Sequence, residues 1–251
     1  MITRSLTPAE LLQLQRWNTP TIYNGWEQIT RHDAARDAVN LEETRDFMPE
    51  ALPMCGWAVT VVVQPGDRSH APRGGELWSA YREYLASQPG PKIVVVQDLD
   101  KPACYGAGWG EVNTNIHRAL GCIGGIIDGA VRDVDEIRHT GFKTLARRLA
   151  VGHACAIPIR WGGEVEVFGR KVQPGQLIHA DKHGFIAIPS GEERGLLEAA
   201  RFMDQAECET LIPAARGAQG LPLPQVLQNI NAAAAEFGRR ARERFQRSGE
   251  W

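Results

Sequence analysis

The side chains best able to do chemistry gather between Tyr105 and Asp133. A glycine-rich segment, Gly106-Ala107-Gly108-Trp109-Gly110, precedes a helix that is predicted to start near Glu111. Free backbone N–H groups at a helix N-terminus, approached through glycines, form an anion-binding site. The stretch ends in Arg132-Asp133, where a guanidinium suits a carboxylate ligand and a carboxylate suits a hard divalent cation. The stretch therefore predicts a site for a small anion and a metal ion.

Each of these features also has an ordinary structural interpretation. The glycine segment lacks both the GK[ST] end of a P-loop and the spacing of GxGxxG, and Trp109 would obstruct a pyrophosphate. A lone glycine-rich segment is more often only a turn. Arg132-Asp133 alone could be a solvated surface pair of little energetic value. The convergence of all three features in one strand–helix–strand unit is what favours a site.

The predicted elements around this stretch bring its two ends together. Apolar, β-branched runs predict buried strands at 56–63, 93–96 and 123–127. Helices are predicted over 76–87 and over 111–120, and Gly121 closes the second. Ligands of open α/β sheets bind at the carboxyl ends of the strands. We therefore expect residues 128–133 to lie beside the glycine-rich segment.

The rest of the chain changes character twice. Thr7-Pro8-Ala9-Glu10 predicts a capped helix start, and Asn18-Thr19-Pro20 is expected to end that helix. Short segments between turn signals indicate antiparallel strands at 154–159, 164–168, 177–180 and 185–188. The end of the chain is predicted to hold a helix, a linker and an amphipathic helix, at 192–211, 217–224 and 224–247. The plan is α/β first, β-rich in the middle and helical at the C-terminus.

Composition narrows the class of protein. The 251 residues are 43% hydrophobic and 23% charged, as in soluble globular proteins, and they can bury a core without disulfides. A net charge of −2 creates no strong field for nucleic acid or an anionic membrane. No apolar run reaches about 18 residues, the first residues lack the apolar core of a signal peptide, and the five cysteines are scattered without a CxxC pair. We expect a cytoplasmic protein with reduced thiols and no nucleic-acid or membrane partner.

Two blocks of sequence resemble the RraA-like family. In the first, twenty residues separate Gly110-Glu111 from Arg132-Asp133, and Gly121, Gly125 and Asp128-Gly129 lie between them. The second block is VQPGQLIHADKHGF, residues 172–185. The resemblance covers about Thr19 to Glu209. The family includes 4-hydroxy-4-methyl-2-oxoglutarate / 4-carboxy-4-hydroxy-2-oxoadipate aldolases, which also decarboxylate oxaloacetate, and a regulator of ribonuclease E.

The resemblance implies a fold and an assembly. The fold would be α/β, a swivelling β/β/α domain within residues 1–217, with extra terminal helices. Residues 218–251 would form a C-terminal linker and amphipathic helix. The assembly would be a homotrimer or homohexamer with its active sites between subunits.

The resemblance also implies roles for individual residues. Pyruvate would be held by the backbone at Gly110, Glu111, Val112 and Asn113. Arg132 would bind its carboxylate and carbonyl oxygen, and Asp133 would anchor Mg²⁺ or Mn²⁺, directly or through water. A glutamate from the post-barrel helix of the neighbouring subunit would reach the metal's water. By position this glutamate is Glu207, with Glu209 as the alternative.

The function implied is a divalent-metal-dependent lyase acting on a small 2-oxo acid. It would release pyruvate by retro-aldol cleavage or by oxaloacetate decarboxylation, with Arg132, Glu111 and Asp133 as catalytic residues. Glu111 or a metal-bound hydroxide could serve as base. The aldolases carry aspartate where this chain has Glu111, one methylene longer. The alternative is a non-catalytic regulator that binds a ribonuclease or RNA helicase through its ring surface. Retention of Arg132 and Asp133 favours the enzyme.

The remaining polar residues are expected to be structural. Asp181 suits a turn cap, and His179 and His183 flank that turn, which argues against a His₂ zinc site. His117 would pack within its helix or face solvent. Structural roles are also expected for His153, Cys104 and Cys155. The basic run 239–244 could bind RNA, but the interleaved Glu243 favours a solvated or oligomer-facing helix.

Overall fold

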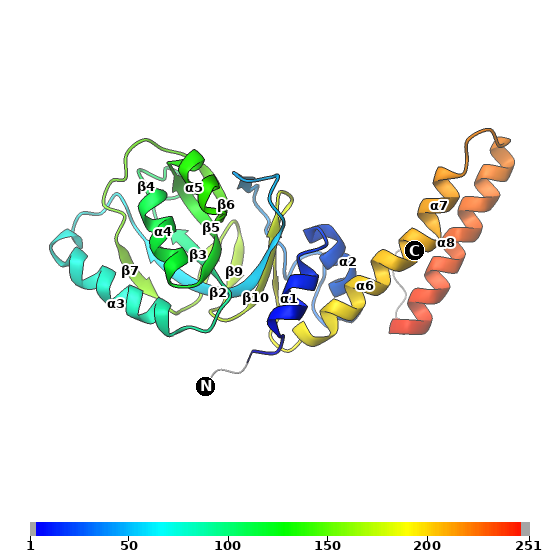
Figure 1. The fold of residues 1–251 in the computed structure, drawn as a ribbon, viewed down its shortest axis with the longest axis horizontal. Coiled ribbons are helices and arrows are strands. Elements are labelled where there is room, and N and C mark those ends of the chain that lie inside the picture. The colour runs from blue at the N-terminus through cyan, green and yellow to red at the C-terminus, as the bar shows by residue number, and fades with distance from the viewer. Residues whose placement is uncertain (1–3, 247–251) are drawn as a thin grey trace.

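A computed structural model describes residues 4–246 (Figure 1). Most of its strands form one sheet with a continuous hydrogen-bonded path. In spatial order the path is β1 (Arg45–Asp46), β6 (Lys143–Leu149), β5 (Cys122–Val131), β3 (Lys92–Asp98), β2 (Met54–Val63), β10 (Leu177–Asp181) and β11 (Gly184–Ile188). Off this path, β4 (Ala107–Trp109) pairs with β5 and β7 (Pro158–Trp161) pairs with β2. A separate hairpin joins β8 (Val165–Val167) and β9 (Arg170–Val172).

The parallel strands β2, β3, β5 and β6 form the centre of this sheet. In β2, β3 and β5 nearly all residues are buried, which explains the continuous apolar, β-branched runs in the sequence. The expected α/β class is confirmed. β5 runs to Val131, four residues beyond the predicted end, and so reaches directly to Arg132.

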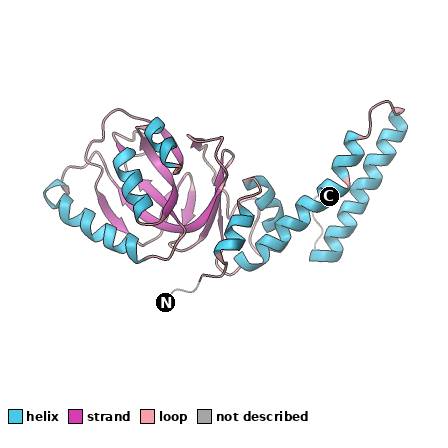
Figure 2. Ribbon diagram, viewed as in Figure 1, coloured by secondary structure: helices cyan, strands magenta, loops and turns pink. Residues whose placement is uncertain are grey.

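Each face of the sheet has its own cover. One face packs against the helices α3 (Gly74–Ser87), α4 (Glu111–Ala119) and α5 (Val134–Thr140), as Figure 1 shows. A short 3₁₀ helix, η1 (Ala71–Arg73), leads into α3. The other face is covered by the β8–β9 hairpin and by the β10–β11 strands, because the sheet curls over its own core (Figure 2). Phe168 and Phe185 meet edge-to-face in this second core.

The N-terminal helices pack against the later helix α6 (Glu193–Glu209). In α1 (Pro8–Leu14) the predicted capping box is present, since the Glu10 amide donates to Thr7 and the Thr7 amide donates to Glu10. The prediction for Asn18-Thr19-Pro20 is wrong in one respect, because α1 ends at Leu14 and these residues begin a second helix, α2 (Thr19–Ile29). Asn18 caps α2 by accepting from the Thr21 amide at 2.9 Å.

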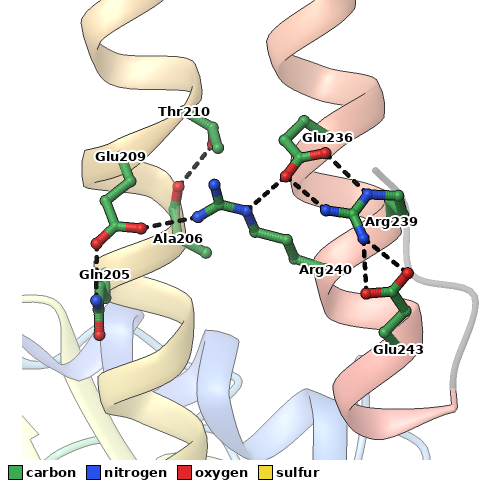
Figure 3. A network of polar contacts seen from close by, with 8 residues as sticks. All are labelled: Gln205, Ala206, Glu209, Thr210, Glu236, Arg239, Arg240 and Glu243. Carbon is green, nitrogen blue, oxygen red and sulfur yellow. Dashed lines mark hydrogen bonds and ion pairs between the residues drawn. The ribbon is translucent and has the colours of Figure 1, made fainter.

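The C-terminal helices form an arm that projects from the sheet (Figure 1). α6 continues into α7 (Leu211–Arg216), and α8 (Leu223–Phe245) returns beside them. Figure 3 shows the ion pairs formed by the basic run of α8. Arg240 pairs with both Glu209 and Glu236, and Arg239 pairs with Glu236 and Glu243. These pairs favour a solvated helix face. The predicted end of this helix, at residue 247, lies outside the described residues.

Several short elements differ from the prediction. The glycine-rich segment contains β4, the segment 154–159 is irregular until β7 begins at Pro158, and α5, β6 and β9 were not expected at all. Within residues 4–246 no helix has the length and apolar character needed to cross a bilayer. All five cysteines fall in this range, and each is a free thiol.

Candidate active site

Parallel pairing of β4 with β5 brings the two ends of the predicted site together. Ala107 pairs with Ala130 and Trp109 with Val131, so both strands end at the same level. The Arg132 amide continues this pairing by donating to the Trp109 carbonyl at 2.9 Å. Gly110 and Arg132 therefore leave the sheet edge side by side, which is the juxtaposition expected from the sequence.

Asp133 is fixed in an uncommon backbone conformation between β5 and α5. Its φ of 54° and ψ of 42° are left-handed. Its Oδ2 accepts from the Glu111 amide at 3.1 Å and lies 3.5 Å from Arg132 Nε. Its Oδ1 accepts no hydrogen bond from any residue in 4–246. One carboxylate oxygen thus holds the site together while the other is available to a ligand.

Gly110 is the N-cap of α4 and must be small for this arrangement to exist. A Cβ at this position would lie 2.5 Å from Asp133 Oδ2 and 3.2 Å from Arg132 Cγ. The glycine therefore allows the backbone of α4 to approach the Arg132-Asp133 pair closely.

A cavity of about 360 Å³ opens at this point. Five residues predicted for the site line it: Gly110, Val112, Asn113, Arg132 and Asp133. No residue in 4–246 accepts a hydrogen bond from the amides of Val112 or Asn113. These two N–H groups are at the first turn of α4, where an anion is favoured. The cavity thus combines free backbone donors with a guanidinium and a carboxylate.

Glu111 and Glu207 take other positions. Glu111 contributes its backbone amide to Asp133, but its side chain is exposed and is not part of the cavity wall. Glu207 lies on α6, where its Oε1 accepts from Asn24 Nδ2 at 3.2 Å and partial burial raises its pKa. Within one chain α6 lies far from α4 and α5 (Figure 1). Only a neighbouring subunit could bring Glu207 to Asp133.

His117 supports the site from behind. Its Nδ1 lies 2.6 Å from the Asn113 carbonyl, so this nitrogen carries the proton, and its Nε2 accepts from the Tyr81 hydroxyl at 3.0 Å. Burial lowers the pKa of His117 to about 4, which keeps the ring neutral. Of the two expectations for His117, packing is the one observed. The ring joins α4 to α3, and its centroid lies 4.3 Å from that of the Trp109 ring, to which it is tilted by 56°.

The cavity also contains residues that the sequence did not indicate. Trp78 and Arg82 come from α3, and His153 and Cys155 come from the loop before β7. His153 and Cys155 were expected to be purely structural, yet they line the cavity. No local motif marks any of the four, because each reaches the cavity only through the tertiary fold. Ala154, which also lines the cavity, has a left-handed φ of 45°.

The carboxylate of the site fits a hard divalent cation that takes only part of its coordination shell from the protein. In the described part of the chain, no group of three or more His, Cys, Asp or Glu side chains could enclose a metal ion. Asp133 Oδ1 is an unpartnered carboxylate oxygen, the ligand type that Mg²⁺ and Mn²⁺ prefer. Mg²⁺ ordinarily binds through one or two carboxylates with water and substrate oxygens, and Asp133 offers one such carboxylate.

The family model described as RraA-like, aldolase/RraA, matches residues 19–187. The chain belongs to the RraA-like family. The matched range includes the whole Gly110–Asp133 segment, whereas Glu207 lies beyond it. This RraA-like protein is 27% identical over 176 residues to a Halalkalibacterium halodurans protein named "Putative 4-hydroxy-4-methyl-2-oxoglutarate aldolase". The alignment covers 67% of this chain and 75% of that protein.

Solved structures share the fold of this RraA-like protein. An uncharacterized protein from Pseudomonas syringae pv. tomato aligns with a TM-score of 0.68 at 21% identity, over 91% of this chain and 97% of that one. Streptomyces coelicolor RraAS2, described as an unusual member of the RNase ES inhibitor RraA protein family, aligns with a TM-score of 0.66 at 18% identity. That alignment covers 82% of this chain and 98% of the other. The RraA-like fold expected from the sequence is confirmed.

Proposed function

We propose that this RraA-like protein is a divalent-metal-dependent lyase that releases pyruvate from a small 2-oxo acid. The reaction would be retro-aldol cleavage of a 4-hydroxy-2-oxo acid, decarboxylation of oxaloacetate, or both. The observation that carries the proposal is the meeting of Arg132, Asp133 and the first turn of α4 in one cavity. The similarity to a protein named as an aldolase supports the same reaction class.

The first turn of α4 would bind the carboxylate of the 2-oxo acid. The free amides of Val112 and Asn113 face the cavity from a helix N-terminus, and the Asn113 side chain is held by donating to the Gly108 carbonyl at 2.8 Å. Backbone donors of this kind are already oriented before the ligand arrives, so binding costs little reorganisation. The pyruvyl end of the substrate would then lie against Arg132.

Arg132 would stabilise the charge that develops in both reactions. Cleavage of the C3–C4 bond, with either an aldehyde or ketone or CO₂ as the leaving fragment, places negative charge on the C2 oxygen of the pyruvate enolate. A guanidinium directed at this oxygen lowers the barrier. Among residues 4–246, the Arg132 side chain makes only a long 3.4 Å contact from Nη1 to the Val151 carbonyl and a 3.5 Å contact from Nε to Asp133. Most of its donors therefore remain available to substrate.

Asp133 would hold the metal ion through Oδ1, and Glu207 of a neighbouring subunit would contact it through water in a trimer or hexamer. When bound, Mg²⁺ or Mn²⁺ would supply Lewis-acid chemistry for stabilising the negative charge of the enolate. Glu111, exposed at the start of α4 next to the cavity, would take the proton from the 4-hydroxyl group in the retro-aldol reaction. No lysine lines the cavity within residues 4–246, so the described chain offers no amine there for a Schiff base.

The test is a coupled assay of pyruvate formation. Oxaloacetate and a set of branched 4-hydroxy-2-oxo acids would be supplied with Mg²⁺ or Mn²⁺, and pyruvate would be followed with lactate dehydrogenase. We expect turnover that EDTA abolishes and that added Mg²⁺ or Mn²⁺ restores. Full activity after exhaustive chelation would contradict the mechanism. An absence of pyruvate from every substrate would instead favour the regulator that binds a ribonuclease or helicase.

A further inference from the structure

The cavity contains a histidine that the proposed reaction does not use. Of the described residues that line the cavity, His153 is the only histidine. The residue is exposed, so its imidazole can exchange protons with water as well as with a ligand in the cavity. Within residues 4–246 its side chain makes one hydrogen bond, to the backbone of the next residue. The imidazole is therefore not committed to another side chain of the described chain.

This hydrogen bond sets the tautomer of the His153 ring. Nδ1 lies 2.8 Å from the Ala154 carbonyl oxygen, which can only accept, so Nδ1 carries a proton. In the neutral ring Nε2 then holds the lone pair, and in the charged ring Nε2 holds the second proton. Nε2 is therefore the atom through which His153 would give or take a proton.

The backbone around His153 is held against the glycine-rich segment. The Gly152 carbonyl accepts from the Ala107 amide at 2.8 Å. Gly106 allows this contact, because a Cβ there would lie 2.7 Å from the His153 carbonyl oxygen and 2.5 Å from Ala154 Cβ. The position of His153 is thus fixed by the same segment that leads into α4.

The loop of His153 also contacts Arg132. The Val151 carbonyl, two residues before His153, lies 3.4 Å from Arg132 Nη1. Arg132 is the side chain assigned above to the C2 oxygen of the pyruvate enolate. The carbon that completes the reaction, C3, is bonded to C2. The loop therefore brings an imidazole to the part of the cavity where the enolate would form.

The proposed reaction needs a proton at C3 for which no donor has been assigned. Cleavage leaves the enolate, and pyruvate forms only when C3 takes up a proton. The ionisable side chains that line the cavity in residues 4–246 are Arg82, Arg132, Asp133, His153 and Cys155. Arginine keeps its proton, Asp133 is assigned to the metal, and a cysteine thiol ordinarily lacks the basic form near neutral pH. Histidine is the residue type that populates both forms there.

We propose that His153 is the acid–base residue that delivers the proton to C3 of the pyruvate enolate. The assignment rests on the proposed function, because it needs the pyruvyl group bound between α4 and Arg132. In this step the C2=C3 electron pair takes the proton from Nε2, the C3–H bond forms and the C2 carbonyl is restored. Nε2 then regains a proton from water. In reverse, neutral Nε2 removes a methyl proton from pyruvate, and the carbonyl electron pair moves onto the oxygen beside Arg132.

The reverse step can be measured without any cleavage. The full-length protein would be incubated with pyruvate and Mg²⁺ in deuterium oxide, and the loss of the methyl signal followed by proton NMR. We expect the wild type to exchange the methyl protons for deuterium. His153→Gln should exchange at least about 100-fold more slowly, with a KM for pyruvate within about threefold of the wild-type value. His139→Gln is the matched control, since His139 is exposed on α5 but does not line the cavity, and it should exchange at the wild-type rate.

A second variant separates proton transfer from a structural role. His153→Ala leaves space that a small azole added to the buffer can fill. Imidazole and 1,2,4-triazole have nearly the same shape, but the triazole is a far weaker base. Imidazole should restore part of the exchange and the triazole should not, because proton transfer depends on basicity and filling of space does not. Thermal unfolding of each variant would confirm that it is folded.

The outcomes are distinguishable from those of the pyruvate assay. Wild-type exchange in folded His153→Gln overturns the assignment, and so does equal rescue of His153→Ala by the two azoles. Absence of exchange in the wild type overturns it as well. If the wild type exchanges the methyl protons through His153 but cleaves no substrate, the proposed lyase reaction fails and the role of His153 stands. If pyruvate is formed and His153→Gln exchanges normally, the reverse holds.

Discussion

Gly110→Ala tests whether the close approach of α4 to Asp133 is what makes the site. The backbone of Gly110 is extended, with φ −157° and ψ −167°, a conformation that alanine adopts freely. The added methyl group is therefore the whole perturbation. It would lie 2.5 Å from Asp133 Oδ2, far inside the contact distance.

The size of the effect follows from the distance that must be gained. Carbon and oxygen need about 3.2–3.5 Å, so the Asp133 carboxylate and the α4 backbone must separate by about 0.7–1 Å. A misplacement of about 1 Å can cost about 100-fold in rate, or about 2.7 kcal/mol of barrier. The Asp133 side chain is 36% exposed and can turn outward. The free energy of unfolding should therefore fall by less than about 1 kcal/mol.

The assay is kcat and KM for pyruvate formation, measured beside chemical denaturation of the same preparation. Gly75→Ala is the control, since a Cβ at Gly75 on α3 would meet nothing within 4 Å. That variant should keep wild-type kinetics and gain a few tenths to about 1 kcal/mol of stability, because alanine favours helix. Wild-type kcat in folded Gly110→Ala would refute the reasoning. It would show that the contact between Asp133 and the Glu111 amide is not needed for the reaction.

Three further predictions concern the site and its assembly. Arg132→Lys should lower kcat/KM by about 2–4 kcal/mol in transition-state stabilisation without affecting folding, and wild-type kinetics would remove Arg132 from the reacting centre. Asp133→Ala and Glu207→Ala should each be inactive, whereas an oligomer refolded from a mixture of the two variants should recover a fraction of wild-type activity. Mixed oligomers that stay inactive would contradict a site shared between subunits. A fully active Glu207→Ala would mean that the same test should be repeated with Glu209. Burial lowers the pKa of His179 to about 4, below its unfolded value of about 6.5, so the unfolded chain binds the extra proton as pH falls between these values. The free energy of unfolding should therefore drop by about 2 kcal/mol for this group between pH 7 and pH 5, and His179→Gln in urea titrations should flatten that pH dependence; an unchanged slope would contradict it.

The sequence predicted those parts of the fold that are encoded locally. The capping box of Thr7 and Glu10 needs only four adjacent residues, and it forms as expected. The buried runs in β2, β3 and β5 are apolar on both faces because both faces are covered, and this pattern is visible without a partner. The juxtaposition of Gly110 and Arg132 was also expected from the strand–helix–strand order, and it is observed.

The parts that were missed depend on contacts between distant segments. β4 is three residues long and contains a glycine, so only its pairing with β5 makes it a strand. α5 is a seven-residue helix after a left-handed Asp133, with no helical run long enough to identify. Asparagine is compatible with both the end and the start of a helix. Only the packing of α2 against α6 decides that Asn18 precedes a helix start. In the cavity, Trp78 and Arg82 arrive from another helix, which no spacing rule connects to Arg132.

The left-handed backbone of Asp133 has a consequence for any attempt to make this protein more robust. Aspartate tolerates this conformation better than most residues, but glycine tolerates it without penalty, while alanine is strained there by about 1 kcal/mol. Asp133→Gly should therefore unfold at a higher temperature than Asp133→Ala, although both lose the carboxylate. A stability screen should therefore rank glycine above alanine at this position, although neither variant keeps the carboxylate. A library selected for stability needs a catalytic readout to tell such variants from functional protein.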